Sequence, residues 1–388
     1  MSISGEISRI NGNITAAYNA CQHKGATMPQ TQNSANLAAT IAGIPSSPIY
    51  GVSGLASDNE SQTLTRTDSA IGKSYAINSA TGEIASDFNT VFPWNEAEII
   101  NDAAGKFLKM PEMYFRVGVN ASSEITDVAV SKAPNSEGSW YKVDPFCISC
   151  YGGSLDSNDK LKSVSGAERQ SARTRAVYRE YAAANGSEYH VYDLYHRTVM
   201  MFLWLIEFAT RNNETVMTGR INGSGTQGGK SVRPTGGTDN LTTPSGYELD
   251  YGQMRYHYIE DFCGNLRDLT EGIECEDAGS NHYVTANPAD YGTKANMSQL
   301  SYSVPAGGCI AAFGWDSDHP FLCMPVTTIG FNAAKYFGDE WAPDAGKTTL
   351  TCGVSYINGS GNLQGMTRCA AEADSNFATN GARLIKEV

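Results

Sequence analysis

Basic residues are scarce in this sequence. Its 388 residues include 28 Lys and Arg but 41 Asp and Glu, which gives a formal net charge of −13 at pH 7. Proteins that bind nucleic acids neutralise phosphates with a basic surface. The charge balance therefore argues against a nucleic-acid partner, and acidity that serves only solubility is the plainer interpretation of it.

Long apolar runs are also missing. The longest, VMMFLWLI at residues 199–206, is far shorter than the ~20 residues that cross a bilayer, so we expect no membrane insertion. The first residues, MSISGEISRING, lack the basic start and apolar run of a secretory signal. We therefore expect a protein that is made and kept in a cytosol until it is released.

Motifs for catalysis and for metal binding are absent as well. The sequence has no GxSxG, P-loop or HExxH motif, and its six histidines show no ligand-like spacing. The nine cysteines are an odd number, and Cys147 and Cys150 form a Cys-x-x-Cys without a second pair, which disfavours a zinc site. We expect buried free thiols, no metal, no cofactor and no enzymatic activity.

The first 45 residues carry a regular apolar pattern. Isoleucines and two small residues recur at alternating spacings of four and three, at Ile3, Ile7, Ile10, Ile14, Ala17 and Cys21. This is a heptad seam, and isoleucine at both seam positions favours trimers or tetramers. The alternative is a single amphipathic helix packed on its own domain. Residues 33–41 predict a second short helix, so we assign residues 1–45 to a helical oligomerisation or attachment segment.

The remaining chain predicts an α+β protein. Residues 46–105 are rich in Ser, Thr, Asn and Gly and indicate a small β-rich domain, and residues 106–388 indicate a larger domain. Within it, residues 107–117 predict a broken strand pair. Residues 167–184 predict a helix, and Asp193 is placed to cap a second helix that runs to about Arg211.

The C-terminal residues 350–388 are dense in Gly, Asn, Ser and Ala and poor in large aliphatic residues until their end. Such a segment cannot form a core of its own. Small and polar side chains held on a rigid frame suit a recognition surface. Ordinary surface loops are the alternative.

An acidic pair lies near a tryptophan, at Asp316, Asp318 and Trp315. The pattern fits a sugar or calcium site, although Asp-x-Asp is more often a solvated turn. Trp315 and Tyr336 are our candidates for a ligand pocket, with carbohydrate as one ligand class.

Several segments together resemble a known family. GNLRDL at residues 264–269 is similar to an element of C-type lectin folds of the formylglycine-generating-enzyme class. Gly353, Tyr356, Gly359, Gly365, Ser375 and the GARL sequence at 381–384 resemble the variable region of proteins diversified by retroelements. LTRTDSA, DFNTVFPW and FLKMPEMYFR resemble segments of phage tail proteins that carry this domain. Leu269 and Tyr356 stand where the family has tryptophan.

The resemblance implies a C-terminal C-type lectin fold with a variable region at about 335–388, in a phage tail-tip protein that binds a host cell-surface protein or glycan. It implies a location in the virion tail, a homotrimer, and attachment to other tail proteins through the N-terminus. The candidate ligand-binding positions are Tyr356, Asn358, Arg368, Ala370, Ala371, Glu372, Phe377 and Thr379.

On strands, alternate side chains share a face, so we expect Tyr356 with Asn358, and Phe377 with Thr379, to form two sets, with positions 368–372 in a loop between them. Arg383 is expected to brace the fold through a carboxylate. The alternatives are a surface lectin of fixed specificity, a structural tail protein, and a relative of copper-dependent oxidases. The last would require Cys352 and Cys369 to meet.

Overall fold

A computed structural model describes most of the chain, in two compact units, Met1–Pro48 and Ile49–Val388. The described residues are 3–23, 28–42, 47–135, 138–220, 232–250, 252–275, 282–332, 334–343, 348–356, 369–372 and 377–388. The order of elements mixes helices with many antiparallel strands, so the α+β class is confirmed.

The first unit is a pair of helices, α1 (Ile3–His23) and α2 (Ser34–Ala42). Tyr18 is fully buried, and its hydroxyl donates a 2.8 Å hydrogen bond to the Asn33 carbonyl oxygen. In contrast, Ile3, Ile7 and Ile10 are 83%, 54% and 47% exposed. Of the predicted seam, the helix pair therefore buries Cys21 and partly buries Ile14 and Ala17.

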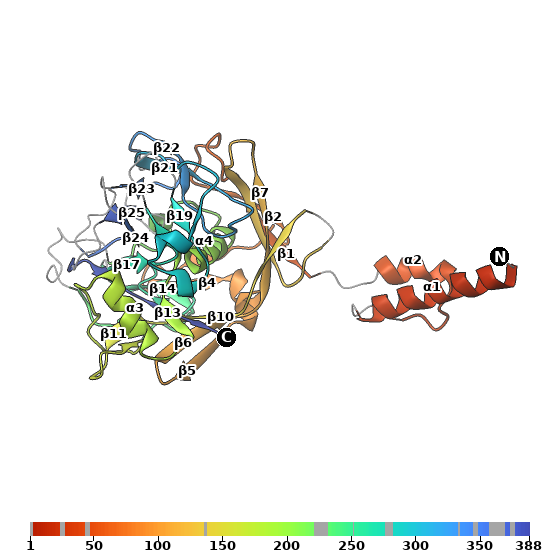
Figure 1. The fold of residues 1–388 in the computed structure, drawn as a ribbon, viewed down its shortest axis with the longest axis horizontal. Coiled ribbons are helices and arrows are strands. Elements are labelled where there is room, and N and C mark those ends of the chain that lie inside the picture. Colours follow the sequence, from red (N-terminus) through yellow and green to blue (C-terminus); the bar gives the residue numbers. More distant parts are fainter. Residues whose placement is uncertain are drawn as a thin grey trace. The chain divides into compact units, whose positions relative to one another are not determined.

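The second unit is built on four larger sheets (Figure 1). In order across the first, the strands are β2 (Thr65–Asp68), β1 (Ile49–Ser53), β8 (Ile125–Ser131), β7 (Met113–Val119) and β9 (Trp140–Val143). The second contains β13 (Tyr189–Val191), β27 (Leu384–Glu387), β10 (Phe146–Ser149), β6 (Gly105–Met110) and β5 (Glu98–Asp102). The third contains β16 (Ile259–Glu260), β15 (Met254–Tyr256), β14 (Ser245–Tyr247), β4 (Glu83–Ser86) and β3 (Tyr75–Ile77).

The fourth sheet carries the C-terminal region. Its strands are β22 (Pro325–Ile329), β21 (Gly308–Phe313), β23 (Glu340–Trp341), β25 (Cys369–Glu372), β24 (Thr349–Cys352), β17 (Arg267–Thr270) and β26 (Asn380–Gly381). The strands labelled in Figure 1, from β22 to β17, follow one another down one side of the unit. Smaller sheets pair β11 (Ser154–Leu155) with β12 (Leu161–Lys162), and β19 (Tyr283–Val284) with β18 (Ile273–Glu274) and β20 (Ser298–Gln299). Short 3-10 turns cover Asp87–Thr90, Trp94–Glu96, Asn213–Thr215, Pro288–Asp290 and Lys294–Asn296.

The helix α4 (Leu194–Phe208) forms the centre of the core. The Asp193 carboxylate accepts a 2.8 Å hydrogen bond from the His196 backbone N–H, so the predicted cap is confirmed. Residues 199–206 are all buried. Burial on every side explains why this run is apolar all round.

The helix α3 (Arg175–Ala183) begins later than the predicted residue 167. Upstream, the Gln170 N–H donates to the Gly153 carbonyl oxygen, a long-range bond that competes with an intrahelical one. Thr174 instead caps the helix by accepting from the Val177 N–H.

The predicted boundary near residue 105 is wrong. Strand β1 lies inside the first sheet, where it pairs with β8, and β5 pairs with β6 across the expected border. Strands leave backbone groups unpaired at their edges unless they join a sheet, and these strands find their partners beyond residue 105. Residues 49–105 therefore belong to the same unit as the rest.

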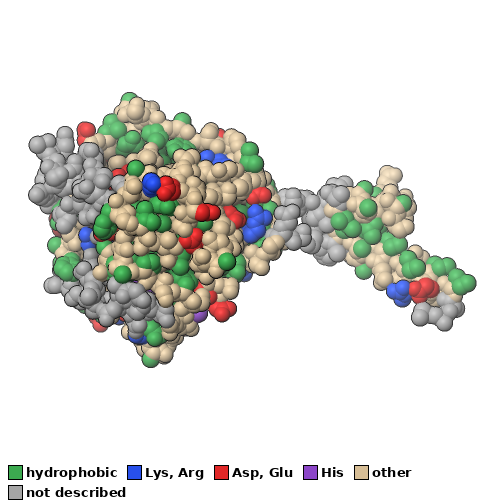
Figure 2. Space-filling view, turned by 90° about the horizontal axis from the view of Figure 1, so that it is seen from above, with side chains coloured by type: hydrophobic (Ala, Val, Ile, Leu, Met, Phe, Trp, Pro, Cys, Tyr) green, Lys and Arg blue, Asp and Glu red, His purple; other side chains and the backbone are tan. Residues whose placement is uncertain are grey.

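Acidic and basic side chains are interspersed on the face of the second unit that Figure 2 shows, and no continuous basic surface occurs among the coloured residues of that view. Within the described part of the chain, no helix is both long and apolar enough to cross a membrane.

Candidate functional site

The C-terminal segment is held at both ends by one short stretch of backbone. The Tyr356 N–H donates a 2.9 Å hydrogen bond to the Asn265 carbonyl oxygen, and the Arg267 N–H donates a 3.0 Å bond to the Thr379 carbonyl oxygen. Since Asn265 and Arg267 are two residues apart, the chain leaves and returns at the same place. Residues 357–378, which we call the display segment, therefore start and end side by side.

The backbone stretch that contains Asn265 and Arg267, which we call the anchoring stretch, is itself held in place by buried hydrogen bonds. The buried Asn265 side chain donates to the Arg233 carbonyl oxygen at 3.1 Å and to Asp261 at 2.8 Å, and it accepts from the Arg233 N–H. Gly264 has φ +94°, and a Cβ there would lie 2.6 Å from the Arg220 nitrogen. Only glycine fits such a position without strain, which gives the Gly-Asn pair seen in the sequence a structural reason.

Burial changes sharply where the display segment begins and ends. Leu350, Val354 and Ser355 before it are fully buried, and so are Asn380 and the GARL residues after it. Tyr356 and Thr379 are half-buried, while Phe377 is 47% exposed. A rigid frame thus carries side chains that reach solvent.

The predicted ligand-binding positions have different outcomes. Asn358 and Arg368 lie outside the described residues. Ala370, Ala371 and Glu372 are not in a loop, because they belong to β25, between β23 and β24. Tyr356, Phe377 and Thr379 lie in turns and irregular backbone next to the sheet, so the predicted alternation along strands is wrong for them.

Trp315 and Tyr336, the candidates for a ligand pocket, are buried side chains. Each is 5% exposed. The Trp315 ring packs against Tyr141 and Phe321 at centroid distances of 5.0 and 5.4 Å, and Tyr336 lies against the Arg211 guanidinium. Both are core residues, and the sequence pattern alone did not distinguish a buried aromatic residue from a pocket wall.

Asp316 organises a turn. Its carboxylate accepts hydrogen bonds from the backbone N–H groups of Ser301 and Asp318 at 2.9 and 3.0 Å, and contacts His319 Nδ1 at 3.1 Å. Burial would raise the pKa of Asp316, but the bonds from His319 and Ser301 hold it below its ordinary value. Over the residues that the structure covers, no group of three or more His, Cys, Asp or Glu side chains could hold a metal ion.

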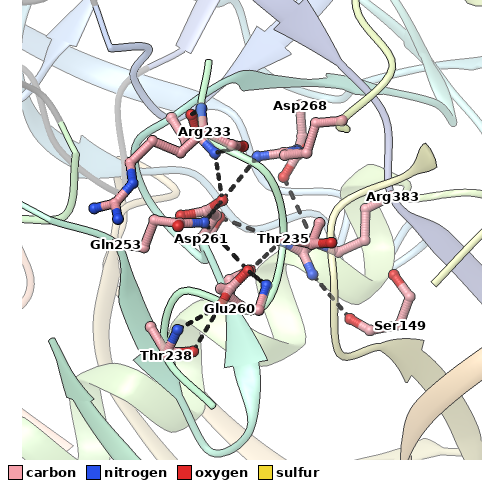
Figure 3. A network of polar contacts seen from close by, with 12 residues as sticks. Ser149, Arg233, Thr235, Thr238, Gln253, Glu260, Asp261, Asp268 and Arg383 are labelled. Atoms are coloured by element: carbon pink, nitrogen blue, oxygen red, sulfur yellow. Dashed lines mark hydrogen bonds and ion pairs between the residues drawn. The ribbon is translucent and has the colours of Figure 1, made fainter. Parts of the chain in front are cut away.

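A buried polar network lies beneath the anchoring stretch (Figure 3). Arg383 donates to the carbonyl oxygens of Ser149 and Glu260 at 2.8 and 2.6 Å, and its Nε lies 3.7 Å from Asp268 Oδ2. Arg169 lies 3.3 Å from the same carboxylate. The prediction that Arg383 braces the fold through a carboxylate is confirmed.

Two adjacent carboxyls complete this network. Glu260 accepts from the Gly236 and Thr238 N–H groups and the Thr238 hydroxyl, and Gln253 donates to both Glu260 and Asp261. Burial, and secondarily the charge of Asp261, raises the pKa of Glu260, and burial raises the pKa of Asp261. Asp261 Oδ1 is buried without a hydrogen-bond partner among the described atoms. Both carboxylate oxygens of Glu260 already accept hydrogen bonds. A proton held by this carboxyl pair therefore fits Asp261 better than Glu260.

Sequence reasoning did not find two hollows of the second unit. A cavity of about 20 Å³ below the start of the display segment is lined by Tyr192, Arg197, Met201, Phe262, Asp268, Cys352 and Gly353. Its volume suits about one water molecule. A groove of about 600 Å³ runs over β21, β22 and β23, where glycines at 307, 308 and 330 leave room beside the exposed Phe331. The only sequence signal for the groove is its glycine content.

The sheet register brings together two cysteines that are distant in sequence. Strands β24 and β25 are antiparallel, and Cys352 is the direct cross-strand partner of Cys369. Cys352 is buried. The fold thus supplies the closeness that the oxidase alternative required of these two positions.

No family model and no curated protein matches the chain. Among solved structures, the chain is similar to PvdO from Pseudomonas aeruginosa, with a TM-score of 0.31 and 12% sequence identity. The match covers 75% of this chain and 98% of that chain. A likeness this weak carries no argument about fold or function, so the function has to be inferred from the geometry of the site.

Proposed function

We propose that this protein is a receptor-binding protein of a phage tail tip, in which a C-type lectin scaffold presents the display segment to a host cell-surface protein or glycan. The observation that carries the proposal is the shared anchor. The backbones of Asn265 and Arg267 form hydrogen bonds with the backbones of Tyr356 and Thr379, the two residues that flank 357–378. A change of side chain inside the segment leaves these hydrogen bonds in place.

Loop physics supports variation in residues 357–368, the part of the display segment that precedes β25. The entropy of closing a loop depends only weakly on its length once its ends are fixed. Binding residues are often found on loops that a rigid scaffold positions. The composition of residues 357–368, with Gly, Ser, Asn and Gln, matches the adaptable polar contacts of known recognition loops.

One half-buried and one exposed aromatic residue at the ends of the segment suit binding. Tyr356 is half-buried and Phe377 is 47% exposed. Aromatic side chains supply large contact area at a small cost in conformational entropy and dominate many interfaces. They would lie on either side of the polar loop and contact the ligand, whether or not these two positions vary in sequence.

Trimer formation through the N-terminal helices would bring together three copies of a weak binding site. Figure 2 shows hydrophobic side chains on the surface of the helical unit, among which Ile3, Ile7 and Ile10 are exposed. A trimer formed along this face would join three display segments, and linked sites gain avidity without new contacts. The same unit would attach the protein to other tail proteins in the virion.

An exchange experiment tests the proposal. Residues 357–368 are replaced by several unrelated Gly/Ser/Asn-rich sequences of equal length, and binding to host cells and Tm are measured. The proposal expects binding to change between variants while Tm stays within about 2 °C, since surface substitutions cost little stability. A matched control replaces Leu350 with Ala, which should lower Tm through a core cavity. Unchanged binding in all loop variants, or a Tm loss as large as that of the control, would contradict the proposal.

Genome context separates this proposal from a lectin of fixed specificity or a structural tail protein. A diversified segment requires a neighbouring reverse-transcriptase gene and a near-copy of the coding sequence that differs only at adenines. A locus without both would favour a fixed surface.

The cross-strand cysteines favour one further candidate, a relative of copper-dependent oxidases. Thiolates are soft ligands that select Cu(I), and Cys352 and Cys369 are partners in the strand register. Metal analysis of purified protein decides this candidate: one tightly bound copper per chain supports it, and its absence after loading with copper removes it.

A further inference from the structure

Two cysteines lie at the open end of the pairing between β24 and β25, next to the residues that connect these strands. In the ladder of β24 and β25, the last residue of β24, Cys352, is opposite the first residue of β25, Cys369. Residues 353–368 connect the two strands. The pair therefore sits where the chain leaves the sheet and where it returns.

The backbone spacing at this position suits a covalent link. Directly opposed residues of antiparallel strands have Cα atoms about 4.5 or about 5.5 Å apart, depending on the type of pair. Disulfides span Cα distances of about 4.4–6.8 Å. Both types of pair fall inside this range, so the Cα spacing that the register sets is compatible with a disulfide between the two positions.

We propose that Cys352 and Cys369 form a disulfide that closes residues 353–368 into a covalent ring when the protein meets an oxidising environment. The register of β24 and β25 carries this proposal. Cys147 is a contrasting case, because in the pairing of β10 it is opposite Lys109 and Lys386.

The chemistry needs an oxidant, and a small-molecule disulfide such as oxidised glutathione supplies it. One cysteine thiolate attacks a sulfur of the reagent and releases one small thiol. The second cysteine thiolate then attacks the mixed disulfide and releases the other. The two cysteines lose two protons and two electrons, and the reagent is reduced to two thiols. The bond would be absent in a reducing cytosol and would form after release.

Such a disulfide would be useful in a segment whose sequence varies. A disulfide restricts the unfolded chain and stabilises the folded state, more so when the loop it closes is longer. It joins the two residues that flank 353–368 and does not depend on which side chains lie between them. The bond itself does not depend on receptor binding, so this inference can fail while the proposed function stands, and the reverse also holds.

Peptide mapping tests the proposal on the unmodified full-length protein. Trypsin cleaves after Lys347, Arg368 and Arg383, which places Cys352 in peptide 348–368 and Cys369 in peptide 369–383, each as the sole cysteine. After incubation with oxidised glutathione and alkylation of the remaining thiols, we expect the two peptides as one linked species, two hydrogens lighter than their sum. Reduction before alkylation should return both as separate alkylated peptides.

Melting measurements supply the second readout. The oxidised wild-type protein should melt at least about 3 °C above the reduced protein, and Cys352→Ser/Cys369→Ser should show no such redox difference. Cys309→Ser, a buried cysteine on β21, is the control and should keep the difference. Both peptides recovered singly alkylated after oxidation would overturn the proposal. So would one copper per chain in the wild type that the double variant does not bind, because the pair would then be a metal site.

Discussion

Arg383 lies with its Nε 3.7 Å from Asp268 Oδ2, and both side chains are at least nine-tenths buried. One residue belongs to the GARL sequence after the display segment and the other to the strand that anchors it. The same guanidinium donates to the carbonyl oxygens of Ser149 and Glu260. This pair therefore ties the C-terminal strand, the anchoring strand and the second sheet to one another.

Replacement of this arginine should be costly. Arg383→Met removes a cation beside the buried Asp268 and the donors to three buried carbonyls, those of Ser149, Glu260 and Asp261, so we expect a loss of about 3–5 kcal/mol in the free energy of unfolding. Lys132→Met is the control, since Lys132 and Glu96 form an exposed pair worth less than about 1 kcal/mol. Chemical denaturation of both variants measures the two values. Equal losses would show that Arg383 is not a brace.

The exposed aromatic residue of the display segment should matter little for stability. Phe377→Ala removes a ring that is 47% exposed, so we expect a loss below about 1 kcal/mol, within the range of surface substitutions. Leu384→Ala, at a fully buried position on β27, should cost about 2–5 kcal/mol. Thermal unfolding compares the two. A larger loss for Phe377→Ala would place that ring in the core.

The sequence predicted those features whose cause is local. Asp193 was identifiable as a helix cap because its carboxylate bonds to an N–H three residues away. The broken strand pair expected at residues 107–117 is present as β6 and β7, since Pro111 interrupts an otherwise apolar stretch. The brace at Arg383 was predicted from its place in the GARL ending, with no indication of which carboxylate it would meet.

Features with a distant cause could not be predicted in this way. Ala370 and Ala371 form a strand because β24 lies beside them, and small residues give no alternation that would indicate it. Trp315 packs against Tyr141, which is far away in sequence. The pairing of Cys352 with Cys369 likewise exists only once the sheet has formed.

The carboxyl pair should make stability depend on pH. Burial and the charge of Asp261 raise the pKa of Glu260 from its ordinary 4.5 to about 7, so the folded state holds a proton more tightly than the unfolded state. The stability that this provides is fully present below pH 4.5 and is lost as the pH rises through about 7. Asp261→Asn removes one of the two like charges. We therefore expect Tm to fall less between pH 5 and pH 8 in this variant than in the wild type.

The matched variant at the neighbouring position should behave differently. Glu260→Gln turns an amide toward the Gly236 and Thr238 N–H groups that now donate to the carboxylate, so we expect a loss of about 1–3 kcal/mol at every pH. Identical pH profiles for the wild type and Asp261→Asn would show that the pair holds no extra proton.

The exposed isoleucines of α1 should control assembly. Ile7 and Ile10 lie on the N-terminal half of the helix and are about half exposed in a single chain. Full burial of an exposed isoleucine contributes about 1.5–3 kcal/mol, so each of these half-exposed side chains would contribute part of that amount when three copies join along this face. The double variant Ile7→Asn/Ile10→Asn, and deletion of residues 1–24, should both lower the mass measured by light scattering from a trimer to a monomer.

Ile71→Asn is the control, because it removes an isoleucine that is 70% exposed on the second unit and should leave the trimer intact. An unchanged mass in the double variant and in the deletion would mean that the N-terminal unit does not assemble the protein, and the avidity assigned to it would have no source.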